Sequence, residues 1–486
     1  MNPLRAPKDR GTSLQKAWLY RRNLQDRLLH LMGSYGYQVL EMPILAPADL
    51  FLRKSGGELA SQMFSFLDPG SNSVSLRPEF TAPIMAHYLE GVRPQGIASR
   101  WQYSGPVFRY DGGSTSSRGQ FTQVGAELIG VGGVLADAEL VTLAADVIFG
   151  LGITGYRVKL ADLDVLHSLL DTVGISDRAR TFIIANVPAL QDGTQDSASL
   201  LERAQKLHLA GAGPEDLNLS AAIHGLDDAQ AREVLHGFLN WSGGESPQLG
   251  QRNPEEVVQR LLRKLRGSDD RESLERGFKL AADLAGIHQA PASAIQGARR
   301  VLQQAGANLA ALDRFGTLVD LLESQSPLSG SLVVDFGLAR SIGYYNGIIF
   351  EVTHPDCSGS LGGGGRYDAL ARALGSPEPV PALGFAYNMD TLVELTPANL
   401  AGGGAGASSK NGLLQWPSSA LVLPEGASSH DHALAAAQEL RQSGMMVELE
   451  VSGLNLSDAI SHAVENGLTQ VVVVGHDGQR TLHQVE

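Results

Sequence analysis

The chain has 486 residues, of which 43% are hydrophobic and 19% charged, and its formal net charge is −14. This length predicts two to four domains with a sizeable buried core. No apolar run approaches the ~18 residues that a membrane span needs, and the first residues lack the apolar segment of a secretory signal. The single cysteine, Cys357, excludes internal disulfides and a multi-cysteine zinc site. We therefore expect a cytoplasmic protein with no membrane contact, no metal and no cofactor.

The N-terminal third combines one long helix with pairs of short strands. Leucines near helical spacing predict an amphipathic helix over residues 14–35. The elements expected after it are a strand interrupted near Pro43, a hairpin over residues 64–80, strands over 105–111 and 119–130 around a polar loop, and a helix over 135–149. Strands that follow strands, with helices set apart, favour an α+β antiparallel sheet over a doubly wound one.

The rest of the chain is a helical stretch, more strands and a separate C-terminal domain. From about 160 to 328 the pattern is helical and loop-rich, with LLERAQKL, EEVVQRLLRKL and ARRVLQQ as clear segments. Strand patterns return at SLVVDFGL, GYYNGIIFEV and PALGFAY, so a helical insertion into one sheet is the simplest account. Residues 401–412 form a Gly/Ser/Ala linker. Residues 413–486 then alternate β-α-β-α-β, which predicts a small α/β domain.

Seven segments resemble a known family. FLRKSGG, SLRPEFTAP, GPVFRYD, FTQVGAELIG, LARSIGYYNGIIFEV, GGGGRYDAL and LGFAYNMDTL occur in the order found in histidyl-tRNA synthetases and in their non-synthetase paralogue, the regulatory subunit of ATP phosphoribosyltransferase. The resemblance implies a class II synthetase-like core over residues 1–400, built on a six-stranded antiparallel sheet with flanking helices. It also implies an anticodon-binding-like domain over 413–486. The run GGGGRYDAL lacks the spacing of a nucleotide-binding loop, and a tight crossing of the sheet accounts for it as well.

The resemblance also implies a pocket for L-histidine. Its residues would be Glu79, Thr81, Arg109, Gln123, Glu127, Arg340, Tyr344 and Tyr345. Gln123 and Glu127 are four residues apart, so both side chains point to one face of their strand. A carboxylate buried there needs a cation, because an unpaired charge is costly to bury, and the ligand's ammonium group would supply it. Taken singly, each residue is better interpreted as a satisfied polar group, but together they favour the pocket.

The chemistry of histidine activation departs from the synthetase pattern. Arg109 matches the motif 2 arginine on the α-phosphate side, but the loop after it holds one cation, Arg118. The motif 3 arginine that stacks on adenine falls at Thr391, which has neither a charge nor a planar face. Gly347 stands where synthetases carry an arginine, and Phe80 replaces a glycine and would crowd the pocket floor. Because cations that clamp ATP carry this chemistry, we expect no activation.

The C-terminal domain allows two interpretations. Its fold type reads tRNA in synthetases, and most regulatory subunits lack it, so its presence is the strongest argument for the synthetase branch. Residues 413–486, however, contain two basic residues, Arg441 and Arg480, against nine acidic ones, with no tyrosine or phenylalanine. RNA recognition uses cations for the backbone and aromatic rings for the bases. We therefore expect no tRNA binding, and the alternative role is that of a packing or oligomer element.

These features lead to one main hypothesis and two alternatives. The main hypothesis is a non-catalytic, histidine-binding regulatory subunit. It would pair with a short-form ATP phosphoribosyltransferase catalytic subunit, as a homodimer within a hetero-oligomer, and pass feedback regulation to the first step of histidine biosynthesis. The first alternative is an active histidyl-tRNA synthetase with a divergent ATP site. The second is a retained paralogue with another binding role.

Overall fold

The computed structural model describes residues 14–53, 57–91, 97–110, 119–207, 209, 226, 230–235, 269, 271–338, 345–397 and 418–485. The chain divides into two compact units, which are Met1–Asp164 with Gln289–Ile295 and Ala310–Glu486, and Val165–His288 with Gln296–Leu309. None of the helices in the described ranges is both long and apolar enough to cross a bilayer.

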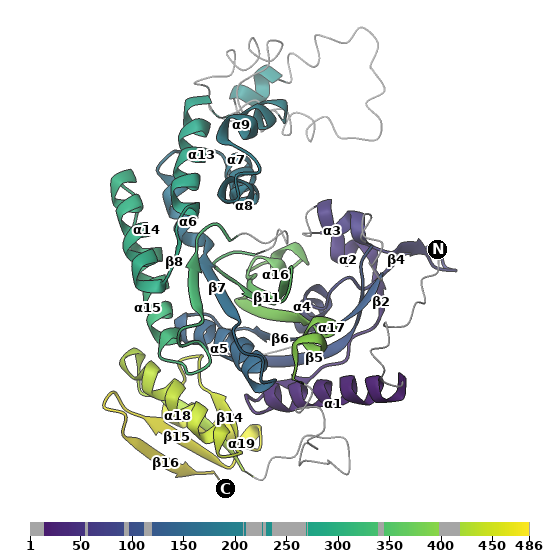
Figure 1. The fold of residues 1–486 in the computed structure, drawn as a ribbon, viewed down its shortest axis with the longest axis vertical. Helices are drawn as coiled ribbons and strands as arrows, with labels where there is room; N and C mark the ends of the chain where they lie inside the picture. Colours follow the sequence, from purple (N-terminus) through teal and green to yellow (C-terminus); the bar gives the residue numbers. More distant parts are fainter. Residues whose placement is uncertain are drawn as a thin grey trace. The chain divides into compact units, whose positions relative to one another are not determined.

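A nine-stranded sheet organises the first unit (Figure 1). The strand order is β1-β5-β6-β12-β11-β10-β7-β9-β8. The strands are β1 (Gln38–Val39), β5 (Ser99–Phe108), β6 (Gln120–Ile129), β7 (Arg157–Asp162), β8 (His288–Gln289), β9 (Leu332–Asp335), β10 (Ile348–Thr353), β11 (Ser360–Arg366) and β12 (Ala382–Asn388). The six neighbours from β5 to β7 all pair antiparallel, which confirms the antiparallel core. The pairs β1–β5 and β7–β9 are parallel, so the whole sheet is mixed.

The glycine-rich run GGGGRYDAL corrects one expectation. It is not a crossing of the sheet: its glycines belong to β11, which pairs with β10 on one side and with β12 on the other. Glycine has a low strand propensity, so the run carried no strand pattern. The missing side chains let other groups approach the sheet closely, because a Cβ at Gly365 would lie 3.0 Å from the Tyr345 ring.

Helices pack on the two faces of this sheet. The helices α1 (Leu14–Gly33) and α5 (Val134–Gly150) contact each other, α15 (Ala310–Glu323) packs on α5, and α17 (Met389–Leu395) packs on α1. On the opposite face, α4 (Thr81–Glu90) contacts α16 (Leu370–Ala373). That face holds a hydrophobic cluster with Phe80, Trp101, Tyr103 and Tyr367 among its members. The expected helices over 14–35 and 135–149 are confirmed as α1 and α5.

A second, smaller sheet is formed by strands between residues 45 and 76. Its strand order is β2-β4-β3, and its elements are β2 (Leu45–Pro47), α2 (Ala48–Leu52), α3 (Gly57–Gln62), β3 (Ser65–Leu67) and β4 (Ser73–Leu76). The strands β3 and β4 pair antiparallel, which confirms the hairpin expected over residues 64–80. Its turn is held by Asp68, whose carboxylate accepts the backbone N–H of Asn72 over 2.8 Å.

The second unit is helical. Its described elements are α6 (Leu163–Asp171), α7 (Asp177–Ala185), α8 (Val187–Gln191), α9 (Ser197–Lys206), α13 (Arg271–Ala285) and most of α14 (Pro291–Ala305). Helix α13 packs against α7, α8 and α9 and buries Leu274 and Phe278. The segments LLERAQKL and ARRVLQQ are confirmed as helices α9 and α14, whereas EEVVQRLLRKL lies outside the described residues.

The C-terminal domain is a small α/β sheet with two helices. Its elements are β13 (Ser419–Pro424), α18 (His430–Gln442), β14 (Met446–Leu449), α19 (Leu456–Glu465), β15 (Gln470–Val474) and β16 (Arg480–Gln484), with strand order β14-β13-β15-β16. The β-α-β-α-β order is confirmed, and β14, β13 and β15 are parallel. Strand β16 adds an antiparallel edge that the sequence pattern did not indicate. The expected linker lies outside the described residues.

Candidate functional site

Two polar residues of β6 lie on the sheet face that carries the aromatic cluster. Gln123 and Glu127 pair in register with Asn388 and Gly384 of β12, and their exposed fractions are 8% and 1%. Their even spacing therefore places both side chains on one buried face. The Glu127 carboxylate lies directly against β12 at Gly384. A Cβ at Gly384 would be 1.5 Å from the Glu127 Oε2 atom. A larger residue at this position of β12 would displace the carboxylate.

Three hydroxyl groups surround the Glu127 carboxylate. Thr81 Oγ1 donates to Oε1 over 2.9 Å, and the Tyr103 hydroxyl donates to the same oxygen over 3.3 Å. The Tyr367 hydroxyl donates to Oε2. Burial raises the pKa of Glu127 to about 8, although these three donors pull it downward. The cause is the low-dielectric surrounding, which disfavours the charged form of a carboxyl group.

Gln123 and Glu127 each lack one kind of partner among the described residues. Among the described residues, no basic side chain forms an ion pair with Glu127, and the charged residue with a marked effect on it is Glu79, which raises its pKa further. In the part of the chain that the structure describes, the Gln123 Oε1 atom is buried without a hydrogen-bond partner. A buried acceptor left in this state costs about 1–3 kcal/mol, and native proteins rarely leave one. The site therefore suits a ligand that brings N–H donors and positive charge.

Glu79 has a structural role beside this site. Its carboxylate accepts the backbone N–H groups of Thr81 and Ala82, the latter over 3.1 Å, and so caps the first turn of α4. Burial raises the pKa of Glu79, while the Ala82 N–H and the charge of Arg109 lower it. The Glu79 carboxylate is therefore hydrogen-bonded within the chain, as expected for a polar group with a structural role.

The remaining expected residues fall at different places. Arg109 lies beside the Glu79 segment, where its Nε donates to the Pro78 carbonyl over 2.8 Å. Tyr345 lies over the glycine strand β11 and packs against the aromatic cluster. Arg340 and Tyr344 lie outside the described residues, so the structure does not place them.

Sequence reasoning missed the two tyrosines that contact Glu127. Tyr367 lies within the segment GGGGRYDAL, and Tyr103 precedes the GPVFRYD segment. Alternation of side chains along β5 could have identified Tyr103. It places Tyr103 on the same face as Trp101, which is the register partner of Glu127.

Phe80 contacts two side chains beside the site. Its ring stacks on that of Tyr103, with centroids 4.2 Å apart and an interplanar angle of 15°. On the same Phe80 ring, the Arg77 guanidinium carbon lies 4.1 Å from the centroid. Because aromatic stacking and cation–π contacts both favour fixed geometry, Phe80 holds the Tyr103 hydroxyl in reach of Glu127.

Two buried ion pairs support this region from the other face of the sheet. Both acids are on α5: Asp137 pairs with Arg366 of β11, and Glu139 receives two N–H groups of Arg100 of β5 over 2.9 and 3.0 Å. Both arginines are close in sequence to the tyrosines that donate to Glu127. Helix α5 therefore fixes the segments that carry those hydroxyl groups.

Two of the residues that depart from the synthetase pattern, Thr391 and Gly347, lie in described parts of the chain. Thr391 is in α17, where the neighbouring Asp390 forms an ion pair with Arg21. Gly347 has φ 77°, a conformation that residues with a Cβ rarely adopt, so an arginine there would be strained. The loop with Arg118 lies outside the described residues. Within the ranges that the structure describes, no group of three or more His, Cys, Asp or Glu side chains could hold a metal ion.

Comparison with known proteins identifies the family. Residues 13–233 and 251–392 match the family model described as histidyl-tRNA synthetase. A histidine–tRNA ligase of Pyrococcus furiosus is 26% identical over 467 residues, covering 95% of this chain and 89% of that protein. An ATP phosphoribosyltransferase regulatory subunit of Moorella thermoacetica is 28% identical over 451 residues, covering 92% of each.

A solved structure from Bacillus halodurans, described as an ATP phosphoribosyltransferase regulatory subunit/histidyl-tRNA synthetase, superposes with a TM-score of 0.54 at 20% identity and covers 97% of this chain and 98% of that one. At this identity the likeness supports the fold alone. It agrees with the antiparallel six-strand core and its flanking helices. The family match over most of the chain is the stronger finding, and the chain belongs to the histidyl-tRNA synthetase family.

Proposed function

We propose that this protein is a histidine-binding regulatory subunit of ATP phosphoribosyltransferase and does not activate histidine. It would bind free L-histidine beside Glu127 and pass the signal to a separate catalytic subunit in the first step of histidine biosynthesis. The Moorella thermoacetica relative carries the name of this function and aligns over 92% of both chains. Because histidine–tRNA ligases align over a similar share, the argument rests on the residues of the site.

The observation that carries the proposal is the pair of acceptors on β6. Among the described residues, Glu127 is buried without a cationic partner and Gln123 Oε1 is buried without a hydrogen-bond donor. Histidine brings an ammonium group and an imidazole ring, which together supply positive charge and N–H donors. The proposed binding residues are Glu79, Thr81, Arg109, Gln123, Glu127, Arg340, Tyr344 and Tyr345, to which we add Tyr103 and Tyr367.

Three positions argue against activation of the bound histidine. Thr391 cannot stack on an adenine or neutralise a phosphate as an arginine does. The left-handed backbone at Gly347 suits glycine and not the arginine of the synthetase pattern. Phe80 fills space beside the site with a ring that is packed between Arg77 and Tyr103. Phosphate-transfer chemistry depends on positioned cations, and these replacements remove two of them.

Calorimetry and pyrophosphate exchange test the two parts of the proposal separately. We expect histidine to bind without ATP, and we expect no histidine-dependent exchange of pyrophosphate into ATP. Undetectable binding at millimolar histidine, both in the free protein and in its complex with the catalytic subunit, would overturn the pocket. Exchange near the ordinary enzyme rate of about 1 s⁻¹ or more would show that the protein is a synthetase.

The partner is tested by co-purification with a short-form catalytic subunit. Histidine must bind the assembly states with different affinity if it regulates them, and the coupling is reciprocal. We expect a hetero-oligomer whose phosphoribosyltransferase activity responds to histidine. A catalytic subunit that neither binds this chain nor changes its activity would contradict the regulatory role while leaving the pocket intact.

An active histidyl-tRNA synthetase is the second candidate function. Two observations favour it: relatives named histidine–tRNA ligase align over 95% or more of this chain, and the chain carries the C-terminal α/β domain. The same pyrophosphate-exchange assay separates it from the regulatory role.

A further inference from the structure

The C-terminal domain contacts the core through the edge of its sheet. The backbone N–H of Val447 donates to the Ser34 carbonyl over 2.8 Å, in the turn that follows α1. Two residues further, the Leu449 carbonyl accepts an N–H of Arg100. Strand β14 is an edge strand, and such edges expose unpaired backbone groups. The core therefore satisfies backbone groups that this domain would otherwise expose.

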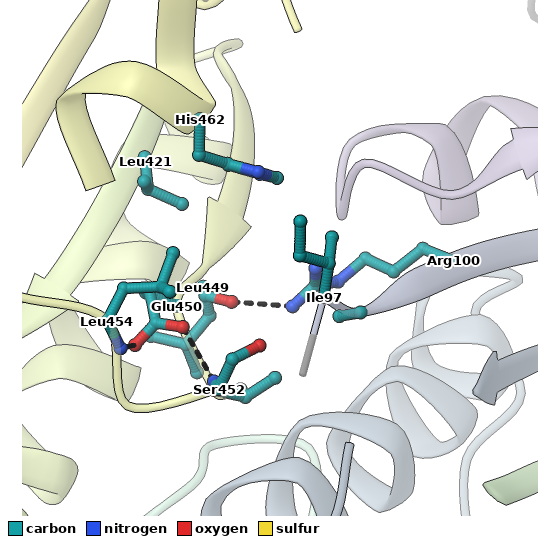
Figure 2. Close-up of a pocket in the computed structure, with 10 residues that line it drawn as sticks. Ile97, Arg100, Leu421, Leu449, Glu450, Ser452, Leu454 and His462 are labelled. Carbon is teal, nitrogen blue, oxygen red and sulfur yellow. Dashed lines mark hydrogen bonds between the residues drawn. The ribbon is translucent and has the colours of Figure 1, made fainter. Parts of the chain in front are cut away.

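Arg100 connects the C-terminal domain to helix α5. Figure 2 shows its side chain reaching from the core to the Leu449 carbonyl, beside a small cavity that Glu450 and His462 also line. The same guanidinium is buried and bound by both carboxylate oxygens of Glu139. A buried ion pair is favourable when its remaining hydrogen-bonding groups are satisfied. The Leu449 carbonyl provides that partner, so the ion pair is complete only when the domain is docked.

Arg441 is the second cation at this contact. Its guanidinium carbon lies 3.5 Å from the centroid of the Tyr35 ring, within the range of a cation–π contact. The hydroxyl of Tyr35 in turn donates to Asp146 of α5. The domain also approaches the core closely at Gly36, where a Cβ would lie 2.5 Å from the Glu448 side chain and φ is +84°. A glycine in the left-handed region makes this approach possible.

Within residues 418–485, two groups that could bind a phosphate backbone are already engaged. Arg480, the other arginine of residues 413–486, forms an ion pair with Glu439 over 2.7 Å. Three successive backbone N–H groups, those of Ser452, Gly453 and Leu454, form a nest of the kind that binds anions. The carboxylate of Glu450 fills this nest over 2.6, 3.0 and 3.1 Å.

We infer that the C-terminal domain is a fixed support for the nine-stranded sheet and not a module that reads RNA. One of its two arginines packs on the core and the other is paired within the domain, whereas RNA binding needs cations that face the phosphate backbone. The contact reaches the candidate site through β5, where Arg100 lies three residues before Tyr103. The contacts between the domain and the core involve none of the residues proposed to bind histidine, so the inference is independent of the proposed function.

A matched pair of variants in the full-length protein tests the support role. Arg441→Met and Arg480→Met each remove one arginine from the same domain, but Arg441 alone of the two contacts Tyr35 of the core. Hydrogen exchange of the backbone amides in residues 34–39 and 446–449 is the measurement. We expect Arg441→Met to speed exchange in both segments at least about tenfold, because loss of docking exposes them to local opening. Residues 34–39 are the readout of docking, because Arg441 also donates to the Val447 carbonyl within its own domain. Arg480→Met should leave both segments unchanged.

Two results would overturn the inference. One is exchange in Arg441→Met that matches the unmodified protein in residues 34–39, since a docked domain must respond to the loss of its cation. The other comes from a gel shift with histidine tRNA over a series of salt concentrations, where we expect no retardation at physiological salt. Salt-sensitive binding that either arginine variant abolishes would show that these arginines bind RNA. Both assays use ligand-free protein, so they stand even if histidine binding fails.

Discussion

Two glutamates are buried to nearly the same depth in the core and have opposite surroundings. Glu139 on α5 receives two N–H groups from Arg100 and forms a complete ion pair. Glu127 on β6 receives three hydroxyl groups and, among the described residues, no cation. A buried carboxylate that is paired with a cation has its charge compensated by the protein. A buried carboxylate without a cation favours the binding of a positively charged group. This difference distinguishes a structural carboxylate from one that binds a ligand.

Removal of the cation from the complete pair should have the largest effect. Arg100→Met leaves the Glu139 carboxylate buried and unpaired, and we expect the free energy of unfolding to fall by about 3–5 kcal/mol. Denaturation in urea measures this loss. The double variant Arg100→Met/Glu139→Leu should recover much of it, because the charge is then removed with its partner. A loss no greater than that of an ordinary surface substitution would mean that Glu139 does not depend on Arg100.

Removal of the carboxylate from the incomplete site should act on ligand binding. Glu127→Ala should weaken histidine binding by about 2–4 kcal/mol, the cost of leaving the ligand's buried charge unpaired. Glu127→Gln keeps the shape of the side chain, and we expect the ligand-free variant to be at least as stable as the unmodified protein. Glu139→Gln, its control in the complete pair, should destabilise because it leaves Arg100 without a counter-charge. Equal destabilisation by the two glutamine variants would contradict the comparison.

The raised pKa of Glu127 predicts a pH dependence of stability. The pKa of Glu127 is about 8 in the folded protein, whereas the pKa of an unfolded glutamate is about 4.3. Between these values the folded state binds more protons, so stability is greatest at the acidic end and falls as pH rises toward 8. The Glu127 contribution to this fall is at most about 1.4 kcal/mol per pH unit. Urea denaturation at several pH values measures it, and Glu127→Gln should flatten the slope; an unchanged slope in that variant would assign the effect elsewhere.

The smallest effect is expected from the ring that positions Tyr103. Phe80→Leu keeps most of the buried volume but removes the stacking contact with Tyr103, which is worth about 0.5–1.5 kcal/mol. We expect a loss of stability of that order together with a few-fold weaker affinity for histidine, measured by denaturation and calorimetry. Phe80→Tyr preserves the ring and should restore the affinity. Full histidine affinity in Phe80→Leu would show that Tyr103 is held by other contacts.

Much of the architecture follows from local patterns in the chain. Leucine spacing indicates α1, turn residues indicate the β3–β4 hairpin, and alternating apolar segments indicate the C-terminal α/β domain. The even spacing of Gln123 and Glu127 places both on one face of β6, which the strand register bears out. These features depend on neighbours within a few residues, which is the range over which propensity and periodicity act.

Other features depend on contacts between distant segments, and only the tertiary structure decides them. The strand identity of the glycine run arises because β10 and β12 pair with it on both sides, although glycine itself disfavours strands. Tyr367 reaches Glu127 across 240 positions of the chain, and Arg100 reaches Leu449 across 349. The sequence by itself determined the residues that could bind a cation and the face on which they lie. Which of the buried carboxylates received a cation from the protein was decided by packing, because a partner's distance depends on the whole fold.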